Sequence, residues 1–202
     1  MIQDVIVLSA LAILLIVLIW LLIQVFRAAR IQRQWSTGWA KMATRHGMTL
    51  NSGATRSLLT GMYQGRILQI IGTYRSGIGI QIATNNYANN NLLMKSRGVA
   101  KRPLEEFEEF FERGFSIESR NPEFAIKLFA NPALRKRLAP LASVAGLTIT
   151  LSGEELSLTS SRLIYDPDEL TSYLVVLSEL ATAIEAIKPL PIIHAPGIPI
   201  GS

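Results

Sequence analysis

The chain has 202 residues, enough for one well-packed domain beside a short separate segment, and its 49% of apolar residues excludes a disordered protein. Cysteine is absent, which excludes disulfides, thiolate catalysis and cysteine-based metal sites. The net charge of +5 is distributed unevenly. Residues 5–104 contain twelve Lys or Arg and no Asp or Glu, whereas residues 105–202 contain eight basic and fourteen acidic residues. This separation predicts a basic side that faces something negative.

The first predicted element is an apolar helix. Residues 5–26 carry no charge, and at about 1.5 Å per residue the segment would extend ~33 Å, close to the thickness of a bilayer's hydrocarbon core. Trp20, near its end, suits a membrane interface. A cleaved signal peptide is the rival interpretation, but the N-terminus lacks basic residues and the apolar core is too long. We therefore expect residues 1–26 to be a transmembrane anchor.

The charges beside this segment predict its orientation. Arg27, Arg30 and Arg33 follow it, and only Asp4 precedes it. Basic residues stay on the cytoplasmic side of a span. We therefore expect a single-pass protein of the inner (plasma) membrane, with its N-terminus outside and its C-terminal domain in the cytoplasm.

Residues 27–47 form the next predicted element, a basic connecting helix that Gly47 ends. One stripe of this helix is apolar, while its basic residues lie elsewhere on the helical wheel. Two interpretations stay open. The stripe packs on the domain's own core, or the helix lies on lipid with its tryptophans inserted. The stripe consists of Ile31, Trp35, Trp39, Met42 and His46.

Residues 48–188 are predicted to form the main domain, which begins with strands. The runs 65–75 and 77–87 are strand-like and are separated by Ser76-Gly77, which predicts a hairpin. The polar segment 85–91 precedes a third strand-like run. Asparagine tolerates turn geometry, so we interpret this segment as a long hairpin tip. A ligand-contacting loop is the alternative.

The rest of the domain alternates helices and strands. Residues 103–115 predict a helix with phenylalanines on one face and glutamates on the other, the glutamates being solvated or paired with arginine. A short strand follows, then two helices capped by Asn121 and Asn131. A hairpin turns at Gly153-Glu154, Asp166 caps a closing helix, and residues 189–202 form a Pro-rich tail.

Residues 39–50 and 138–149 align without gaps, and both read as a helix, a glycine stop and a strand. The match is short, but it supports two related α/β halves. The predicted fold is therefore α+β, with a single N-terminal transmembrane helix followed by a cytoplasmic domain of antiparallel strands packed with helices.

The segment from Glu105 to Leu138 resembles uncharacterised bacterial membrane-anchored proteins whose cytoplasmic domain has the pattern Phe-x-Val-x-Ser-x-Asp, then Ala-x-x-Leu-Leu and a proline. The resemblance extends over about residues 103–187. Asn121 stands where the pattern has Asp. The resemblance implies an α+β module of unknown activity and transfers no catalytic residue. The matching positions are Phe107, Phe111, Phe115, Ile117, Ser119, Ala125, Leu128, Phe129 and Pro132.

Catalytic motifs are not found. The two histidines, His46 and His194, have no second ligand at useful spacing, and no G-x-S-x-G element is present. We predict no cofactor, no metal and no enzymatic activity. The basic half lacks a nucleic-acid-binding motif, so we also predict no nucleic-acid partner.

The sequence therefore favours a non-catalytic accessory or assembly subunit of a larger membrane protein complex. A free-standing, membrane-tethered domain that senses a ligand or lipid is the alternative. The expected partners are anionic lipid headgroups and other membrane-protein subunits. The residues expected to face them are the basic Arg27, Arg30, Arg33, Arg66, Arg75, Arg97 and Arg102 and the interfacial aromatics Trp20, Trp35 and Trp39.

Overall fold

The computed structural model describes residues 2–53, 56–73, 76–87, 89–102 and 105–187, with side chains in these ranges except at 2–12, 28, 31–32 and 34–35. The described chain forms α-helices, one 3-10 helix (η1) and strands. The helices are α1 (Ile2–His46), α2 (Phe107–Gly114), α3 (Pro122–Phe129), α4 (Pro132–Leu138), η1 (Ala139–Ser143) and α5 (Pro167–Ala186). The strands are β1 (Thr49–Ser52), β2 (Arg56–Tyr63), β3 (Arg66–Thr73), β4 (Gly77–Ala83), β5 (Leu92–Ser96), β6 (Phe115–Glu118), β7 (Thr148–Ser152) and β8 (Glu155–Ser160).

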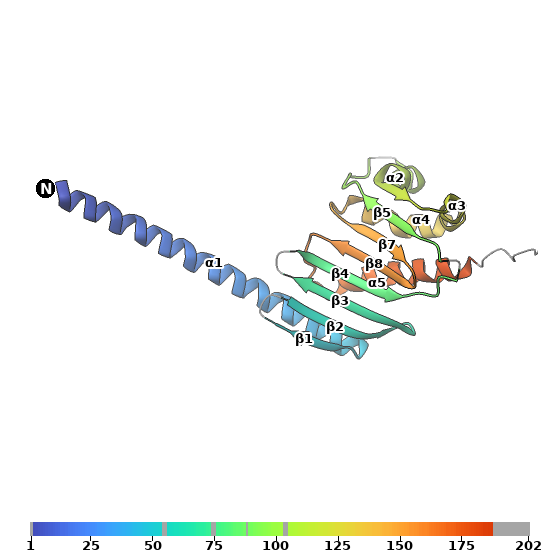
Figure 1. The fold of residues 1–202 in the computed structure, drawn as a ribbon, viewed down its shortest axis with the longest axis horizontal. Coiled ribbons are helices and arrows are strands. Elements are labelled where there is room, and N and C mark those ends of the chain that lie inside the picture. Colours follow the sequence, from blue (N-terminus) through green and yellow to red (C-terminus); the bar gives the residue numbers. More distant parts are fainter. Residues whose placement is uncertain (1, 54–55, 74–75, 88, 103–104, 188–202) are drawn as a thin grey trace, which may run out of the picture.

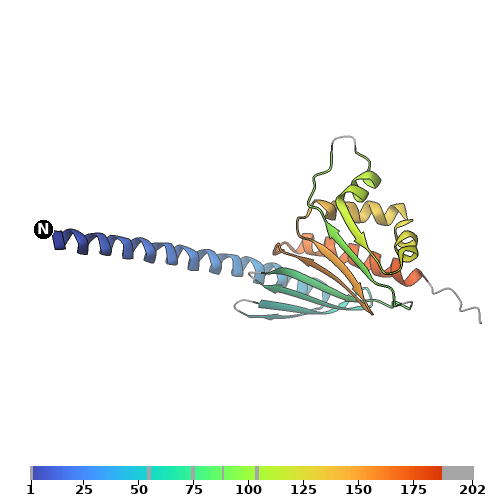
Figure 2. The same cartoon turned by 45° about the horizontal axis from the view of Figure 1, so that its top comes forward.

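The strands of the described chain form one 8-stranded antiparallel sheet in the order β1-β2-β3-β4-β8-β7-β5-β6. The helices pack on one face of this sheet, and α1 extends far beyond it (Figures 1 and 2). The predicted α+β class, with antiparallel strands packed against helices, is thus confirmed.

A single row of apolar side chains crosses the whole sheet at one register position. Side chains alternate between the faces of a strand, so the next residue along each strand points to the open face. That face carries polar positions such as Gln69 and Gln81, which pair with each other. The apolar row is Leu50, Leu59, Ile70, Ile80, Leu158, Ile149, Met94 and Ile117.

The hairpin of β3 and β4 is confirmed, but the interpretation of residues 85–91 as a hairpin tip is wrong. β4 pairs with β3 and β8, whereas β5 pairs with β7 and β6. The segment carries the chain past the β7–β8 hairpin. The buried Asn86 holds it there, since its side-chain amide donates to the carbonyls of Asn90 and Gly153.

The end of α1 packs on the domain core. Trp39 and Met42 are fully buried, and the Trp39 indole Nε1 donates to the Ile164 carbonyl at 2.9 Å. Gly47, at φ 62°, ends the helix as predicted. The core interpretation of the stripe is therefore confirmed at these positions, while the Ile31 and Trp35 side chains lie outside the described residues.

The predicted transmembrane anchor is wrong. Within the part of the chain that the structure describes, none of the helices combines the length and the apolar character that a membrane crossing requires. The single-pass topology, the inner-membrane location and the cytoplasmic placement of the domain all depended on that anchor, and they are withdrawn with it.

The two aligned segments occupy similar local structures but different places in the sheet. Gly47 and Gly146 both have positive φ, at 62° and 70°, and each lies between a helix and a strand. However, β1 is an edge strand, whereas β7 lies between β8 and β5. The similarity therefore reflects a local way of stopping a helix before a strand.

Candidate functional site

A groove lies between the helices on the covered side of the molecule. Its volume is about 750 Å³, within the range of pockets that bind small molecules. α4 and η1 form one wall, α5 forms the other, and the start of α2 closes one end. The lining residues are Phe107, Ala133, Lys136, Arg137, Pro140, Leu141, Ser172, Val175 and Val176.

Local sequence rules position the α4 wall. The Asn131 side-chain oxygen accepts from the backbone N–H groups of Ala133 and Leu134, at 3.0 and 3.4 Å, and so caps the helix. Leu134 and Leu138, four residues apart, are buried in the core. Because these leucines face the core, Lys136 and Arg137 face the groove.

The α5 wall follows from the same periodicity. Asp166 caps this helix by accepting from the N–H of Asp168 at 3.0 Å. Leu170, Leu174 and Leu177 are fully buried. Val175 and Val176 lie between these leucines, are half-buried, and form an apolar floor for the groove.

Cations gather at one end of the groove. Phe107 is 42% exposed, and the Nζ atoms of Lys101 and Lys136 lie 5.0 and 5.7 Å from the centre of its ring. Within the described ranges neither lysine forms an ion pair with a carboxylate. Arg137 is 65% exposed at its side chain and contacts Glu179 of α5 at 3.6 Å. This end of the groove can therefore attract an anion.

The nearby glutamates already have partners. Arg113 donates to both carboxylate oxygens of Glu105, at 2.7 and 2.8 Å, and the backbone N–H of Arg102 donates to the same group. These bonds, those from Arg113 foremost, lower the pKa of Glu105 to about 2. Arg135 contacts Glu108 and Glu112 at 3.0 and 3.8 Å. The prediction that this acidic face is solvated or paired with arginine is confirmed. These carboxylates do not neutralise the lysines of the groove.

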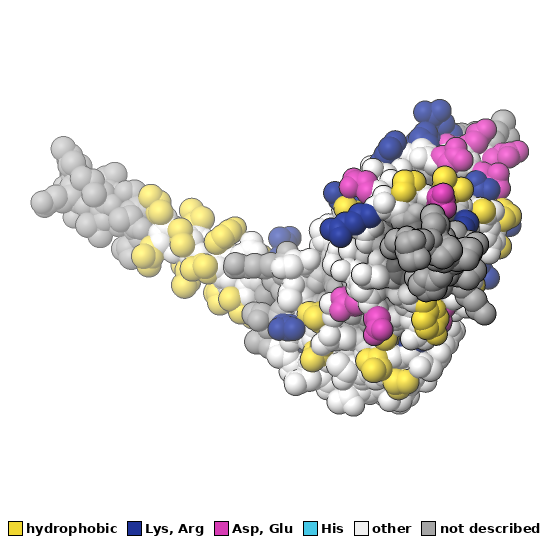
Figure 3. All heavy atoms as spheres, turned by 45° about the vertical axis from the view of Figure 1, so that its right-hand side comes forward, with side chains coloured by type: hydrophobic (Ala, Val, Ile, Leu, Met, Phe, Trp, Pro, Cys, Tyr) yellow, Lys and Arg dark blue, Asp and Glu magenta, His cyan; other side chains and the backbone are white. Residues whose placement is uncertain are grey.

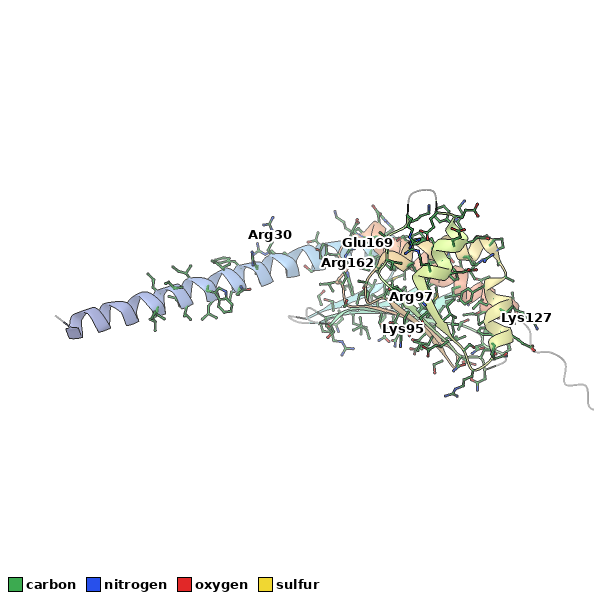
Figure 4. The ribbon with its side chains drawn as sticks, turned by 90° about the horizontal axis from the view of Figure 1, so that it is seen from above. Arg30, Lys95, Arg97, Lys127, Arg162 and Glu169 are labelled. Atoms are coloured by element: carbon green, nitrogen blue, oxygen red, sulfur yellow. The ribbon has the colours of Figure 1, made fainter. Side chains whose placement is uncertain are left out.

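The basic residues predicted from the sequence do not form one surface. Arg27, Arg30 and Arg33 are exposed on α1. Figure 4 shows that Arg30 lies far from Arg97. Arg66 is paired with Glu185 of α5, and its side chain is only 16% exposed. The backbone N–H of Arg97 donates to the Gly114 carbonyl, and the backbone N–H of Arg102 donates to the Glu105 carboxylate, so both arginines lie beside α2. Arg75 lies outside the described residues.

The predicted aromatic residues also separate. Trp20 is 58% exposed on α1, whereas Trp39 is fully buried and belongs to the core. The Trp35 side chain lies outside the described residues.

Sequence reasoning missed the groove. It placed Phe107 on the buried face of its helix and did not single out Lys136 or Arg137. α2 begins at Phe107, so its side chain lies at the helix end, beyond the packed turn formed by the buried Phe110 and Phe111. The sequence does contain one signal for the groove, since Lys136 and Arg137 lie between Leu134 and Leu138 and therefore face away from the buried leucines.

Over the described residues, no three His, Asp or Glu side chains come together as metal ligands would. His46 instead packs edge-on against the Tyr63 ring, with centroids 5.4 Å apart. The expectation that this is not an enzyme stays a prediction.

Charged side chains gather over the α2–α4 end of the molecule, while the surface around β1–β3 is mostly uncharged on the face shown in Figure 3. The charge separation along the sequence thus does not produce one wholly basic side, because Arg45 and Arg66 of the first half pair with Asp168 and Glu185 of the second half.

No family model and no curated protein matches the chain. A solved structure, the mycobacterial trehalose monomycolate transport factor A (TtfA), has a similar fold, with a TM-score of 0.54. The two chains are 12% identical, and the match covers 79% of this chain and 97% of the other. At this identity the likeness concerns the fold alone.

Proposed function

We propose that this protein is a non-catalytic factor that binds an anionic amphiphile, such as a single-chain lipid, in the groove between α4 and α5. The observation that carries the proposal is the combination of an apolar floor with two lysines at one end that pair with no described carboxylate. The apolar chain lies on Val175, Val176 and Leu141, and the anionic head lies beside Lys101 and Lys136. The fold likeness is compatible with this, since TtfA is described as a transport factor for trehalose monomycolate.

Magnitudes indicate that the cations matter for selectivity. A chain that buries about eight methylenes gains ~6 kcal/mol from the hydrophobic effect. Association itself costs at least about 4 kcal/mol in lost freedom of motion. The floor alone therefore gives only weak binding, and the attraction between the head and the lysines decides which amphiphiles bind.

A competition titration tests the proposal. The protein is loaded with a fluorescent fatty acid, which is then displaced by an anionic lysophosphatidylglycerol or by a zwitterionic lysophosphatidylcholine. We expect the anionic lipid to compete better. Lys136→Glu reverses the charge at the head position, and Val176→Asp places a charge on the floor, so each should weaken binding about ten-fold or more.

Lys127→Glu is the matched control, because Lys127 is an exposed lysine on α3 outside the groove (Figure 4). It should change the affinity less than two-fold. Equal affinity in the wild type and both groove variants, with all proteins folded, rules the groove out as the binding site.

A second candidate function, that of an accessory or assembly subunit, is favoured by α1. This helix projects from the domain (Figure 1), and its large apolar side chains from Ile13 to Phe26 are 47–72% exposed. Exposed apolar surface of this extent marks an interaction site. Because the apolar residues surround the helix, more than one neighbouring helix is needed to cover them. We infer a partner protein that supplies those helices.

A further inference from the structure

A second, polar cavity lies at the end of the sheet where the segment before β5, the turn before α3 and the β7–β8 turn meet. Its volume is about 300 Å³, which suits a small molecule rather than a lipid chain. Its lining is rich in side-chain amides. The lining residues are Asn89, Asn90, Asn91, Arg120, Asn121, Ser152 and Gly153.

The orientation of the Asn90 amide follows from its neighbours. The Asn121 side-chain oxygen caps α3 by accepting from the N–H of Phe124 at 3.3 Å, so the Asn121 Nδ2 faces Asn90. That Nδ2 donates to the Asn90 Oδ1 at 3.1 Å. The Asn90 Nδ2 is therefore left without an acceptor among the described residues, although the residue is only 6% exposed. This amide group retains access to the cavity and can donate to an acceptor that enters it.

Two further donors lie beside it. The Asn91 Oδ1 accepts from the backbone N–H of Arg120 at 2.7 Å, which leaves the Asn91 Nδ2 free to donate. Over the described residues, the Arg120 side chain forms no ion pair or hydrogen bond. The cavity lining contains no carboxylate. Two amide donors and one cation thus converge without an anion.

The cavity is also held in shape before any ligand binds. The Asn90 N–H donates to the Asn86 Oδ1 at 3.1 Å, and the Asn86 Nδ2 in turn donates to Gly153 at 2.9 Å. These bonds tie the segment to the β7–β8 turn. A site that is already ordered loses less entropy when it binds a ligand.

We propose that this cavity binds a small molecule with an oxyanion group, either a phosphate ester or a carboxylate. The oxyanion accepts from the Asn90 and Asn91 amides and pairs with the Arg120 guanidinium, which matches both groups by forming two parallel hydrogen bonds. The site shares no residue with the helical groove and does not depend on the function proposed for it.

Titrations followed by NMR test this site. The ¹⁵N-labelled full-length protein is titrated with inorganic phosphate, glycerol 3-phosphate and malonate, and the side-chain amide signals of Asn90 and Asn91 are recorded. We expect saturable shifts of both signals. A response to the two phosphates alone assigns a phosphate ligand, and a response to malonate alone assigns a carboxylate. The absence of any response to all three probes overturns the proposal.

The variants separate binding from folding. Asn91→Asp keeps the oxygen that accepts from Arg120 but replaces the donor by a negative charge, and Arg120→Gln removes the cation. Each should weaken binding about ten-fold or more, since a hydrogen bond to a charged group is lost. Arg97→Gln, at a cation outside the cavity, should leave the affinity unchanged. Unchanged affinity in both site variants, with unchanged thermal unfolding, contradicts the proposal.

Discussion

Glu185 is the residue through which three elements are joined. Both of its carboxylate oxygens accept from the Arg66 guanidinium at the start of β3, one of them at 2.7 Å. The backbone N–H of Asn85, just after β4, donates to the same carboxylate at 2.9 Å. The side chains of Arg66 and Glu185 are 16% and 20% exposed. The hydrogen bonds from Arg66, and then that from Asn85, lower the pKa of Glu185 below its ordinary value of 4.5, although partial burial opposes the shift.

Glu185→Gln should lower the free energy of unfolding by about 1–3 kcal/mol at pH 7, because charge-assisted hydrogen bonds are lost while the shape is kept. A carboxylate with a lowered folded-state pKa contributes stability above its unfolded pKa and loses it as the pH falls through the folded value. The difference between wild type and variant should therefore narrow below pH 4.5. Urea unfolding across this range measures it.

Glu123→Gln is the control for this experiment, since Glu123 is exposed and pairs with no described cation. It should change stability by no more than a few tenths of a kcal/mol at either pH. A Glu185→Gln difference that stays constant down to pH 3 would show that the ion pair does not carry the effect.

At the scale of elements, the seating of α1 depends on a close backbone approach. A Cβ added at Gly38 would lie 1.9 Å from the carbonyl oxygen of Tyr165, which is backbone and cannot rotate away. The same approach lets the Trp39 indole reach the Ile164 carbonyl. Glycine is therefore required here because of space, in a position where the helix would otherwise favour alanine.

Gly38→Ala should reverse the usual stabilising effect of alanine in a helix and lower stability by about 1–3 kcal/mol, the scale of overpacking. The fluorescence of the tryptophans should shift to longer wavelength as Trp39 becomes solvated. Lys41→Ala, at an exposed position on the same helix, should leave both quantities almost unchanged. Stabilisation by Gly38→Ala would mean that α1 is not seated against this loop.

At the scale of the whole molecule, the sheet is continuous but its two ends are built differently. β1–β4 follow each other along the chain, whereas β5–β8 are interleaved with helices. The contact between the two sets is the β4–β8 pair, and α5 packs across both strands. α1 leaves this body as a projecting rod (Figures 1 and 2).

Photo-crosslinking tests whether a partner covers the rod. A photoreactive residue is placed at Leu18 and, separately, at Trp20, which point to nearly opposite sides of the helix at about 100° per residue. If a partner protein supplies helices on both sides, both positions should crosslink to it in cells, and an exposed position on the domain such as Lys127 should not. Crosslinks to a second copy of this chain, or none, contradict the partner proposal.

Much of the local structure follows from the sequence alone. The caps at Asn121, Asn131 and Asp166 were predicted, and each accepts hydrogen bonds from the first turn of its helix. The β7–β8 hairpin turns at Gly153, as expected. These features are decided by groups within a few residues of one another, so the local pattern contains the information.

The tertiary structure alone decided the order of the strands, the two cavities and the role of single charges. β4 and β8 pair across more than seventy residues of chain, and nothing local to Gly77–Ala83 specifies that partner. The sequence near Arg66 offers no acidic partner, and only the packing of α5 places Glu185 beside it. The apolar segment of α1 was interpreted as a membrane anchor because its hydrophobicity shows only that burial away from water is favourable. It does not show whether lipid or protein covers the helix. Contacts between distant segments are chosen by the packing of the whole chain, and that choice is visible only once the chain is folded.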